Sequence, residues 1–257
     1  MKEFLHRVFS YTHYLVKAKT KYYLHSPFVY QFYLHVLGLK NTTENIEHLR
    51  QQLLNNTTQI TFTDLGNNGT QRTRTVSIIV QHSSITPKYG NVLLNAVRYF
   101  QPSTVLELGT NLGISTCYLA QGNKESTVYT IEGSKALSSV AQKNTTTAGI
   151  KNVQFITGNF NEVLPEVLSS IKKVDFVFFD GNHKKTPTLQ YFEQCLNFAH
   201  ENTVFVFDDI YWSQEMSSAW NEIKAHPKVT LSIHIYRMGF VFFNKQKLAK
   251  EHFSLLF

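Results

Sequence analysis

The chain has 257 residues, of which 42% are hydrophobic and 14% aromatic, and its formal net charge is +7. This length can bury a large core in one α/β domain with an extension. No apolar run approaches the roughly 18 residues of a membrane span, and the mixed N-terminus lacks the continuous apolar stretch of a signal peptide. We therefore expect a cytoplasmic globular protein. Cys117 and Cys195 lack metal-type spacing and are expected to be buried free thiols.

The basic charge is concentrated at the N-terminus. Residues 1–40 contain six lysine or arginine residues and one glutamate, with aromatic residues between them. Such a segment could contact RNA, an anionic membrane surface or an acidic substrate. The interpretation we favour is a helical cap whose aromatic side chains pack on the domain while its lysines remain in water. The tyrosines of this segment, with Trp212 and Trp220, could line a substrate pocket or a dimer interface.

Residues before 104 are predicted to be mostly helical, with a turn at Ser26-Pro27. Residues 64–69 combine an aspartate with two glycines, but a polar, basic stretch follows and no strand with a terminal acid comes about 20 residues later. We interpret these residues as a turn or a mobile loop on the substrate side. The expected elements are helices over 1–24, Phe28–Gly38, Glu44–Leu54, Val76–Val80 and Asn91–Phe100, and a strand over Gln59–Thr63.

From Thr104 the chain alternates between apolar β runs and helical patterns, which predicts a parallel, doubly wound sheet. The last two strands are separated only by Arg237-Met238, which predicts a terminal antiparallel hairpin. The fold class is therefore α/β, with a seven-stranded, mostly parallel Rossmann-like sheet and an N-terminal helical extension over 1–84 before a domain over 85–257. The strands are expected over Thr104–Leu108, Thr127–Glu132, Val153–Thr157, Val174–Asp180, Thr203–Asp208, Val229–Tyr236 and Gly239–Phe243. The helices are expected over Ile114–Gln121, Ser134–Ala148, Asn161–Ile171, Thr186–Ala199 and Ser213–Ala225.

A glycine loop follows the first of these strands, in the sequence VLELGTNLGISTCYLA over Val105–Ala120. Gly109 and Gly113 allow tight turns and close approach of a ligand, and the next helix offers unpaired N–H groups. Glu132 ends the second strand 19 residues after Gly113, where it can accept hydrogen bonds from a ribose diol. The spacing is not that of a dinucleotide site.

The loop resembles motif I of the class I S-adenosylmethionine-dependent methyltransferases, E/D-x-G-x-x-x-G. In that family the acidic residue, here Glu107, meets the methionine end of the cofactor, partly through water. After the third strand, Gly158-Asn159-Phe160 replaces the family's Gly-Asp or Gly-Ser. Asn159 can still hydrogen bond to the adenine amino group, and Phe160 can stack on the ring. The implied cofactor residues are Glu107, Gly109, Thr110, Asn111, Gly113, Ser115, Glu132, Gly158, Asn159, Phe160 and Asp180.

Aspartates follow two further strands, in FVFFDGNH and VFVFDDIYW. One such aspartate is ordinary helix capping, but three at adjacent strand ends need a cation, and carboxylate oxygens suit Mg²⁺. This set resembles the metal-dependent, catechol O-methyltransferase-like enzymes, which implies metal ligands at Asp180, Asp208 and Asp209. The family's general base matches His183. Catechol-type enzymes carry lysine there, and the D-G-x-H form resembles sugar and natural-product methyltransferases; Lys184 is an alternative base if the loop is shifted.

These features together predict a Mg²⁺-assisted O-methyltransferase. The metal and a neutral imidazole would activate an acceptor hydroxyl for in-line attack on a sulfonium methyl group. Asp180 and His183 are the expected catalytic residues, and a small hydroxylated molecule is the expected acceptor. One alternative is a tRNA or RNA O-methyltransferase, suggested by the basic N-terminus. Another is a cofactor-binding module without catalysis, in which the carboxylates only cap helices. A homodimer is a further expectation.

Overall fold

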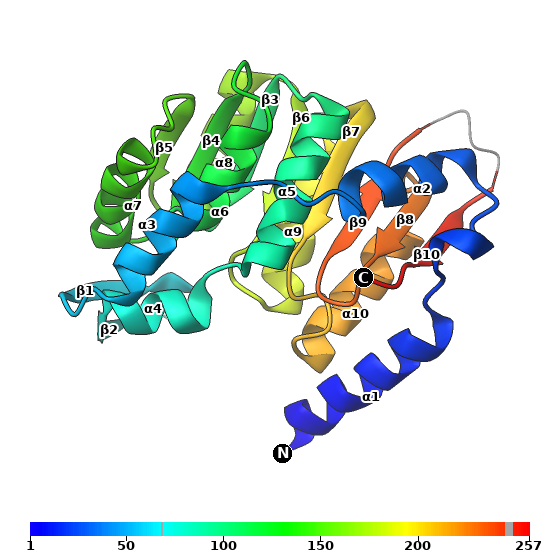
Figure 1. The fold of residues 1–257 in the computed structure, drawn as a ribbon, viewed down its shortest axis with the longest axis horizontal. Helices are drawn as coiled ribbons and strands as arrows, with labels where there is room; N and C mark the ends of the chain where they lie inside the picture. The colour runs from blue at the N-terminus through cyan, green and yellow to red at the C-terminus, as the bar shows by residue number, and fades with distance from the viewer. Residues whose placement is uncertain (68, 245–248) are drawn as a thin grey trace. The chain divides into compact units, whose positions relative to one another are not determined.

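Strands and helices alternate from Thr104 onward in the computed structural model (Figure 1), which describes residues 1–67, 69–244 and 249–257. All seven predicted strands form, and a helix lies near each predicted helical range. The strands are β3 (Thr104–Leu108), β4 (Thr127–Glu132), β5 (Val153–Thr157), β6 (Val174–Phe179), β7 (Ala199–Phe207), β8 (Leu231–His234) and β9 (Gly239–Phe242). The helices between them are α6 (Ile114–Gly122), α7 (Lys135–Thr147), α8 (Phe160–Ile171), α9 (Lys185–Leu196) and α10 (Gln214–Ala225).

The chain folds into two compact units. One consists of Met1–Leu37 and Lys172–Phe257, which we call the terminal unit, and the other of Gly38–Ile171, which we call the central unit. The predicted division into residues 1–84 and 85–257 does not coincide with these limits and stays a prediction. Neither unit contains, among the residues described, a helix both long and apolar enough to cross a membrane.

The central unit holds the parallel strands β3, β4 and β5, adjacent in that order. Helix α6 packs against α5 (Pro87–Phe100), and α3 (Glu44–Leu54) packs against α4 (Val76–Ser83). Four of the five side chains of β3 are buried, which is expected of a strand covered on both faces. The predicted buried free thiol at Cys117 is confirmed on α6, as is that at Cys195 in the terminal unit.

A hairpin in the central unit corrects one expectation. The polar, basic residues after the glycine-containing turn form β2 (Thr70–Thr75), which pairs antiparallel with β1 (Gln59–Asp64). Cross-strand contacts explain this: the hydroxyls of Thr61 and Thr73 are 2.8 Å apart, and Arg72 Nε lies 3.2 Å from Asp64 Oδ2. The predicted turn between them begins with a short 3₁₀ helix, η3 (Leu65–Asn67), while Asn68 lies outside the described residues.

The terminal unit contains a mixed sheet with the order β10-β8-β9-β7-β6. Strands β6 and β7 are parallel, and β9 is antiparallel to both β7 and β8, so the predicted terminal hairpin is confirmed. The edge strand β10 (Glu251–Ser254), parallel to β8, was not predicted. It contains only four residues, EHFS, which is too short a run for a sequence pattern to indicate a strand.

The predicted helix over residues 1–24 is too long. Helix α1 (Lys2–Lys17) stops because Ala18 is extended and Lys19 donates its backbone N–H to Ser254 O at 2.8 Å beside β10. A 3₁₀ turn, η1 (Lys21–Tyr23), helix α2 (Pro27–Phe32) and a π-helical turn, η2 (Tyr33–Leu37), follow. Tertiary pairing with the C-terminal strand thus overrides the amphipathic pattern.

The cap expected at the N-terminus is present within the terminal unit. His6 Nε2 lies 2.8 Å from Ser217 Oγ on α10, beside which α1 runs (Figure 1), and the buried Tyr14 donates its hydroxyl to Leu255 O at 2.6 Å. The aromatic residues do not all pack inward, because Phe4 and Phe9 are exposed. Trp220 is fully buried against Gly239, so it belongs to the core and not to a pocket.

Gly90 provides a test of the packing between α5 and α6. An added Cβ would lie 2.3 Å from a ring carbon of Tyr118, whose ring is fully buried and whose hydroxyl donates to Glu47. Although alanine is favoured over glycine in a helix by about 1 kcal/mol, overpacking typically costs about 1–3 kcal/mol. We expect Gly90→Ala to lower the free energy of unfolding, measured by urea denaturation. Ser139→Ala, at an exposed position of α7, is the control and should change little; equal stability of both variants would contradict the packing argument.

Candidate functional site

The first group of predicted site residues surrounds Glu107, on β3 of the central unit. Its side chain is fully buried, and Oε2 accepts hydrogen bonds from Thr116 at 2.5 Å and Thr130 at 2.6 Å. Thr130 lies directly opposite Glu107 in the β3–β4 pairing, and it also contacts the hydroxyl of Thr110 at 2.5 Å. Glu107 Oε1 is buried and has no hydrogen-bond donor among the described residues.

The loop after β3 is attached to the end of β4 through Glu132. Asn111 donates its backbone N–H to Glu132 Oε2 at 2.8 Å, and Ser134 donates to Oε1 at 2.9 Å. Asn111 has a positive φ of 51°, and its side-chain N–H₂ donates to Ser83 O at 3.1 Å. Its Oδ1 is a second buried acceptor without a described donor. The loop is therefore held in place by Glu132 while it keeps acceptor capacity for a ligand.

The other residues of this group have structural partners. Gly113 has a φ of 81°, and a Cβ there would lie 3.1 Å from Ala141 Cβ on α7, so turn geometry and helix packing both require glycine. Asn159 Oδ1 accepts the backbone N–H of Asn161 at 3.0 Å at the start of α8, and Phe160 is the first residue of that helix. The predicted contacts of Asn159 and Phe160 with adenine stay predictions.

Burial controls the protonation of both glutamates. Desolvation raises the pKa of Glu107 to about 7, against the opposing effect of the nearby hydroxyl groups of Thr116, Thr130 and Ser115. Desolvation also raises the pKa of Glu132, although backbone N–H groups lower it in part. S-adenosylmethionine carries an ammonium group and two ribose hydroxyls, which are donors of the kind that the two unsatisfied acceptors lack. The residues present therefore fit the predicted cofactor.

The second group of predicted site residues lies in the terminal unit, after β6 and β7. The backbone N–H of Asp208 donates to Phe179 O at 3.0 Å, so Asp180 and Asp208 follow neighbouring strand ends. Asp208 is fully buried, and Arg237 donates two hydrogen bonds to its carboxylate. Arg237 Nε lies 2.9 Å from Oδ1, and Nη2 lies 2.7 Å from Oδ2. Arg237 Nε also lies 3.2 Å from Asp209 Oδ1.

The surroundings of Asp209 combine acids and bases. Burial and the charge of Asp208 raise the pKa of Asp209 to about 6, while Arg237, His183 and Arg7 act in the opposite direction. For Arg237, burial alone would lower the pKa of the guanidinium, but the charge and hydrogen bonds of Asp208 raise it above its ordinary value. His183 Nε2 lies 3.6 Å from Asp180 Oδ1, so the two predicted catalytic residues are neighbours.

The three aspartates do not fit the predicted magnesium site as arranged here. Within residues 1–67, 69–244 and 249–257, no three Asp, Glu, His or Cys side chains are placed to hold one metal ion. Both carboxylate oxygens of Asp208 accept N–H groups of Arg237, and Asp209 shares the same guanidinium. The positive charge that offsets Asp208 and Asp209 is therefore the guanidinium of Arg237. The magnesium ligands stay a prediction that this geometry does not support.

Residues outside the predicted set thus complete both groups. Thr116 and Thr130 hydrogen bond to Glu107, and Arg237 pairs with Asp208. The predicted pairing of two parallel strands could have identified Thr130, because a polar residue beside a buried glutamate is an expected donor. Arg237 was predicted only as part of a hairpin turn. Because β9 is antiparallel to β7, the turn before β9 lies beside the end of β7, where Asp208 and Asp209 follow.

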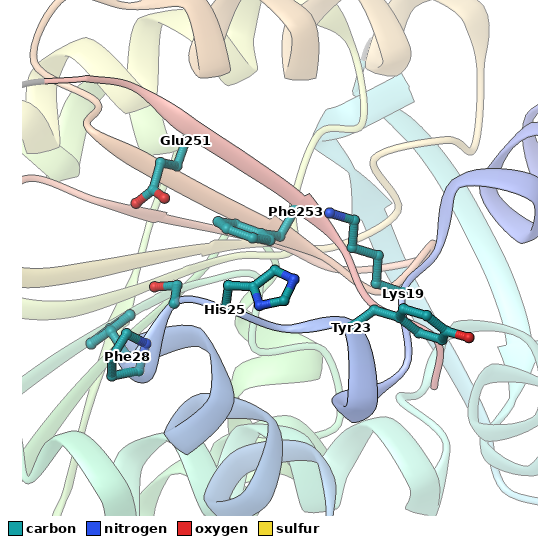
Figure 2. A pocket seen from close by; sticks show the side chains of 8 residues that line it. Lys19, Tyr23, His25, Phe28, Glu251 and Phe253 are labelled. Carbon is teal, nitrogen blue, oxygen red and sulfur yellow. The ribbon is translucent and has the colours of Figure 1, made fainter.

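A pocket lies elsewhere in the terminal unit, between the segment after α1 and strand β10 (Figure 2). Its volume is about 590 Å³, and Lys19 Nζ lies 6.0 Å from the centre of the Phe253 ring. In this view Lys19 and Glu251 stand on opposite sides of Phe253. No residue predicted for the cofactor, the metal or catalysis lines it. The lining residues are Lys19, Tyr23, His25, Ser26, Pro27, Phe28, Glu251 and Phe253.

Residues 106–210 match a family model described as a methyltransferase domain. The chain is 32% identical over 130 residues to a catechol O-methyltransferase from Niastella koreensis, an alignment that covers 49% of this chain and 58% of that protein. It is 28% identical over 154 residues to a probable O-methyltransferase from Mycobacterium tuberculosis, covering 52% of this chain and 65% of that one. The chain thus spans less than two thirds of the length of these curated relatives.

Solved structures support the fold over more of the chain. An O-methyltransferase from Bacillus cereus in complex with S-adenosylhomocysteine matches with a TM-score of 0.57 at 22% identity, covering 83% of this chain and 96% of that one. An O-methyltransferase of tomaymycin synthesis from Streptomyces achromogenes, in complex with S-adenosylmethionine, matches with a TM-score of 0.60 at 18% identity, covering 82% and 94%. The predicted fold class, an α/β Rossmann-like, mostly parallel sheet with an antiparallel hairpin and N-terminal helices, is confirmed.

The raised pKa of Glu107 predicts a pH dependence of stability. Between its ordinary value of 4.5 and about 7, the folded protein retains a proton that the unfolded chain has released. The contribution to stability is therefore present below pH 4.5 and is lost as the pH rises toward 7, by at most about 1.4 kcal/mol per pH unit. Urea denaturation across this range should show a steeper loss for the wild type than for Glu107→Gln. Glu125→Gln, at an exposed position, should keep the wild-type slope; identical profiles for all three proteins would contradict the assignment.

Proposed function

We propose that this chain is a class I S-adenosylmethionine-dependent O-methyltransferase of the catechol O-methyltransferase-like family and that it methylates a hydroxyl group of a small molecule. The match to a methyltransferase-domain model and the similarity to two O-methyltransferases support this proposal. The observation that carries this proposal is the buried carboxylate of Glu107, with one oxygen saturated by two threonines and the other lacking a donor. A buried polar atom left without a partner is costly, and a ligand that supplies the donor removes that cost.

The central unit has the role of binding the cofactor. Glu107 and the acceptor of Asn111 would receive donors of S-adenosylmethionine, and Glu132, which already fixes the loop, would accept from the ribose hydroxyls with its remaining lone pairs. Gly109, Thr110, Gly113, Ser115, Gly158, Asn159 and Phe160 complete the proposed set. The bound cofactor supplies a methyl group activated by attachment to a sulfonium.

The terminal unit has the role of activating the acceptor. A hydroxyl becomes a good nucleophile when its proton is removed, and His183 is the base that we propose, with Asp180 orienting the imidazole and stabilising its charged form. The similarity to a catechol O-methyltransferase supports a small hydroxylated acceptor. Magnesium assistance, predicted from the aspartates, has no part in this proposal because Arg237 already forms ion pairs with Asp208 and Asp209.

Cofactor binding can be tested by calorimetric titration with S-adenosylhomocysteine. We expect the wild type to bind, and Glu132→Gln to bind at least about tenfold more weakly, because a hydrogen bond to a charged group contributes about 1.5–3 kcal/mol. Glu125→Gln in the same unit is the matched control and should bind as the wild type does. No binding by the wild type would remove the proposed function, including the interpretation of the glycine loop.

The catalytic role of His183 can be tested with a panel of hydroxylated aromatic acceptors and, for the RNA alternative, with tRNA. His183→Ala should lower kcat/KM by about 10²–10⁴-fold, as expected for loss of a general base. His48→Ala, an exposed histidine on α3, is the control. Unchanged turnover in His183→Ala would eliminate this residue as the base and direct attention to Lys184. Turnover on tRNA alone would favour the RNA alternative, and S-adenosylhomocysteine binding without turnover on either class would favour the non-catalytic one.

A further inference from the structure

The register of the terminal hairpin brings an arginine to the acidic strand end. Phe207, the last residue of β7, pairs with Gly239, the first residue of β9, in an antiparallel ladder. Residues after Phe207 therefore run beside residues before Gly239, which places Arg237 next to Asp208 and Asp209. The backbone confirms this continuation, because Ile210 donates its N–H to Arg237 O at 3.1 Å.

Arg237 is held from several sides. Ile235 donates its N–H to Met238 O at 2.9 Å across the turn, and Met238 is fully buried. The guanidinium forms a two-pronged contact with Asp208 and a further contact with Asp209 at 3.2 Å. A planar fork on a carboxylate is specific in direction as well as strong. The pair is thus a built feature of the fold and not a flexible surface contact.

The positions that a metal ion would use are taken by this contact. Mg²⁺ binds carboxylate oxygens at about 2.1 Å and needs their lone pairs directed at it. Instead, both oxygens of Asp208 accept hydrogen bonds from the guanidinium of Arg237. Asp209 Oδ1 lies 3.2 Å from Arg237 Nε. A divalent ion beside them would also meet the positive charge of Arg237 at contact distance. The ion and the arginine are alternatives.

We propose that Arg237 takes the place of the divalent metal predicted for this site, so that the chain neutralises Asp208 and Asp209 with its own guanidinium and binds no metal ion there. The proposal rests on the proposed function in one respect: methyl transfer then needs no added metal. A second guanidinium lies nearby, because Arg7 Cζ lies 4.5 Å over the ring of Trp212, whose backbone N–H donates to Asp209 O at 2.9 Å. No further cation is needed to offset Asp208 and Asp209.

The experiment measures Mn²⁺ binding, because Mn²⁺ reports on carboxylate sites through electron paramagnetic resonance of the free ion. Wild-type protein with S-adenosylhomocysteine is titrated with MnCl₂, and we expect no stoichiometric binding. Arg237→Gln frees the carboxylates, so it should gain at least about tenfold in Mn²⁺ affinity, and adding Asp208→Asn to that variant should abolish the gain. Arg72→Gln, which removes an arginine paired with Asp64, is the matched control and should gain nothing.

The outcomes separate this proposal from the proposed function. One equivalent of Mn²⁺ bound by the wild type and lost in Asp208→Asn would overturn the proposal, even if S-adenosylhomocysteine binds. A folded Arg237→Gln that gains no Mn²⁺ affinity would also overturn it, because the arginine would then replace nothing. If Arg237→Gln folds only when MnCl₂ is present, the proposal is supported; if it folds under neither condition, the wild-type titration decides. Failure to bind S-adenosylhomocysteine would count against the proposed function alone.

Discussion

The ion pair between Asp208 and Arg237 ties the end of β7 to the turn between β8 and β9. Asp208 is fully buried, so its charge requires a partner inside the protein, and the hairpin supplies one with two hydrogen bonds. Breaking one side of such a pair typically costs about 3–5 kcal/mol because the remaining charge stays buried. The hairpin register brings Arg237 to this carboxylate, and Asp209, which has a positive φ of 51°, lies beside the same guanidinium.

The central unit meets the same difficulty in a different way. Glu107 is as buried as Asp208, but its described hydrogen-bond donors are hydroxyl groups on one oxygen only, so desolvation prevails and raises its pKa to about 7. The second oxygen of Glu107, Oε1, has no described hydrogen-bond donor. Asp208, by contrast, has both oxygens bonded within the fold. The two buried carboxylates therefore differ in their hydrogen bonding: Glu107 keeps one oxygen without a described donor, whereas Asp208 keeps none.

Much of the fold could be predicted because its strands are buried apolar runs with helices between them, and such runs have few alternatives. Elements stabilised by tertiary pairing were missed. The polar residues of β2 form a strand through cross-strand threonine and Asp64–Arg72 contacts, and α1 ends early because Lys19 pairs beside β10. In the candidate site, the glycine loop and the acidic residues at strand ends could be predicted from their spacing along the sequence. Their partners Thr116, Thr130 and Arg237 were not, because those contacts depend on register.

The aspartates show why a set of acidic residues does not by itself specify a metal. Three carboxylates at strand ends have the same sequence pattern whether a divalent ion or an arginine offsets their charge. The deciding residue lies about 30 positions later, in a turn whose strand is antiparallel to the one that ends at Asp208. The antiparallel register places Arg237, two residues before β9, next to Asp208 and Asp209. A basic residue at this position therefore favours an internal ion pair over a metal, and a neutral one leaves the carboxylates available.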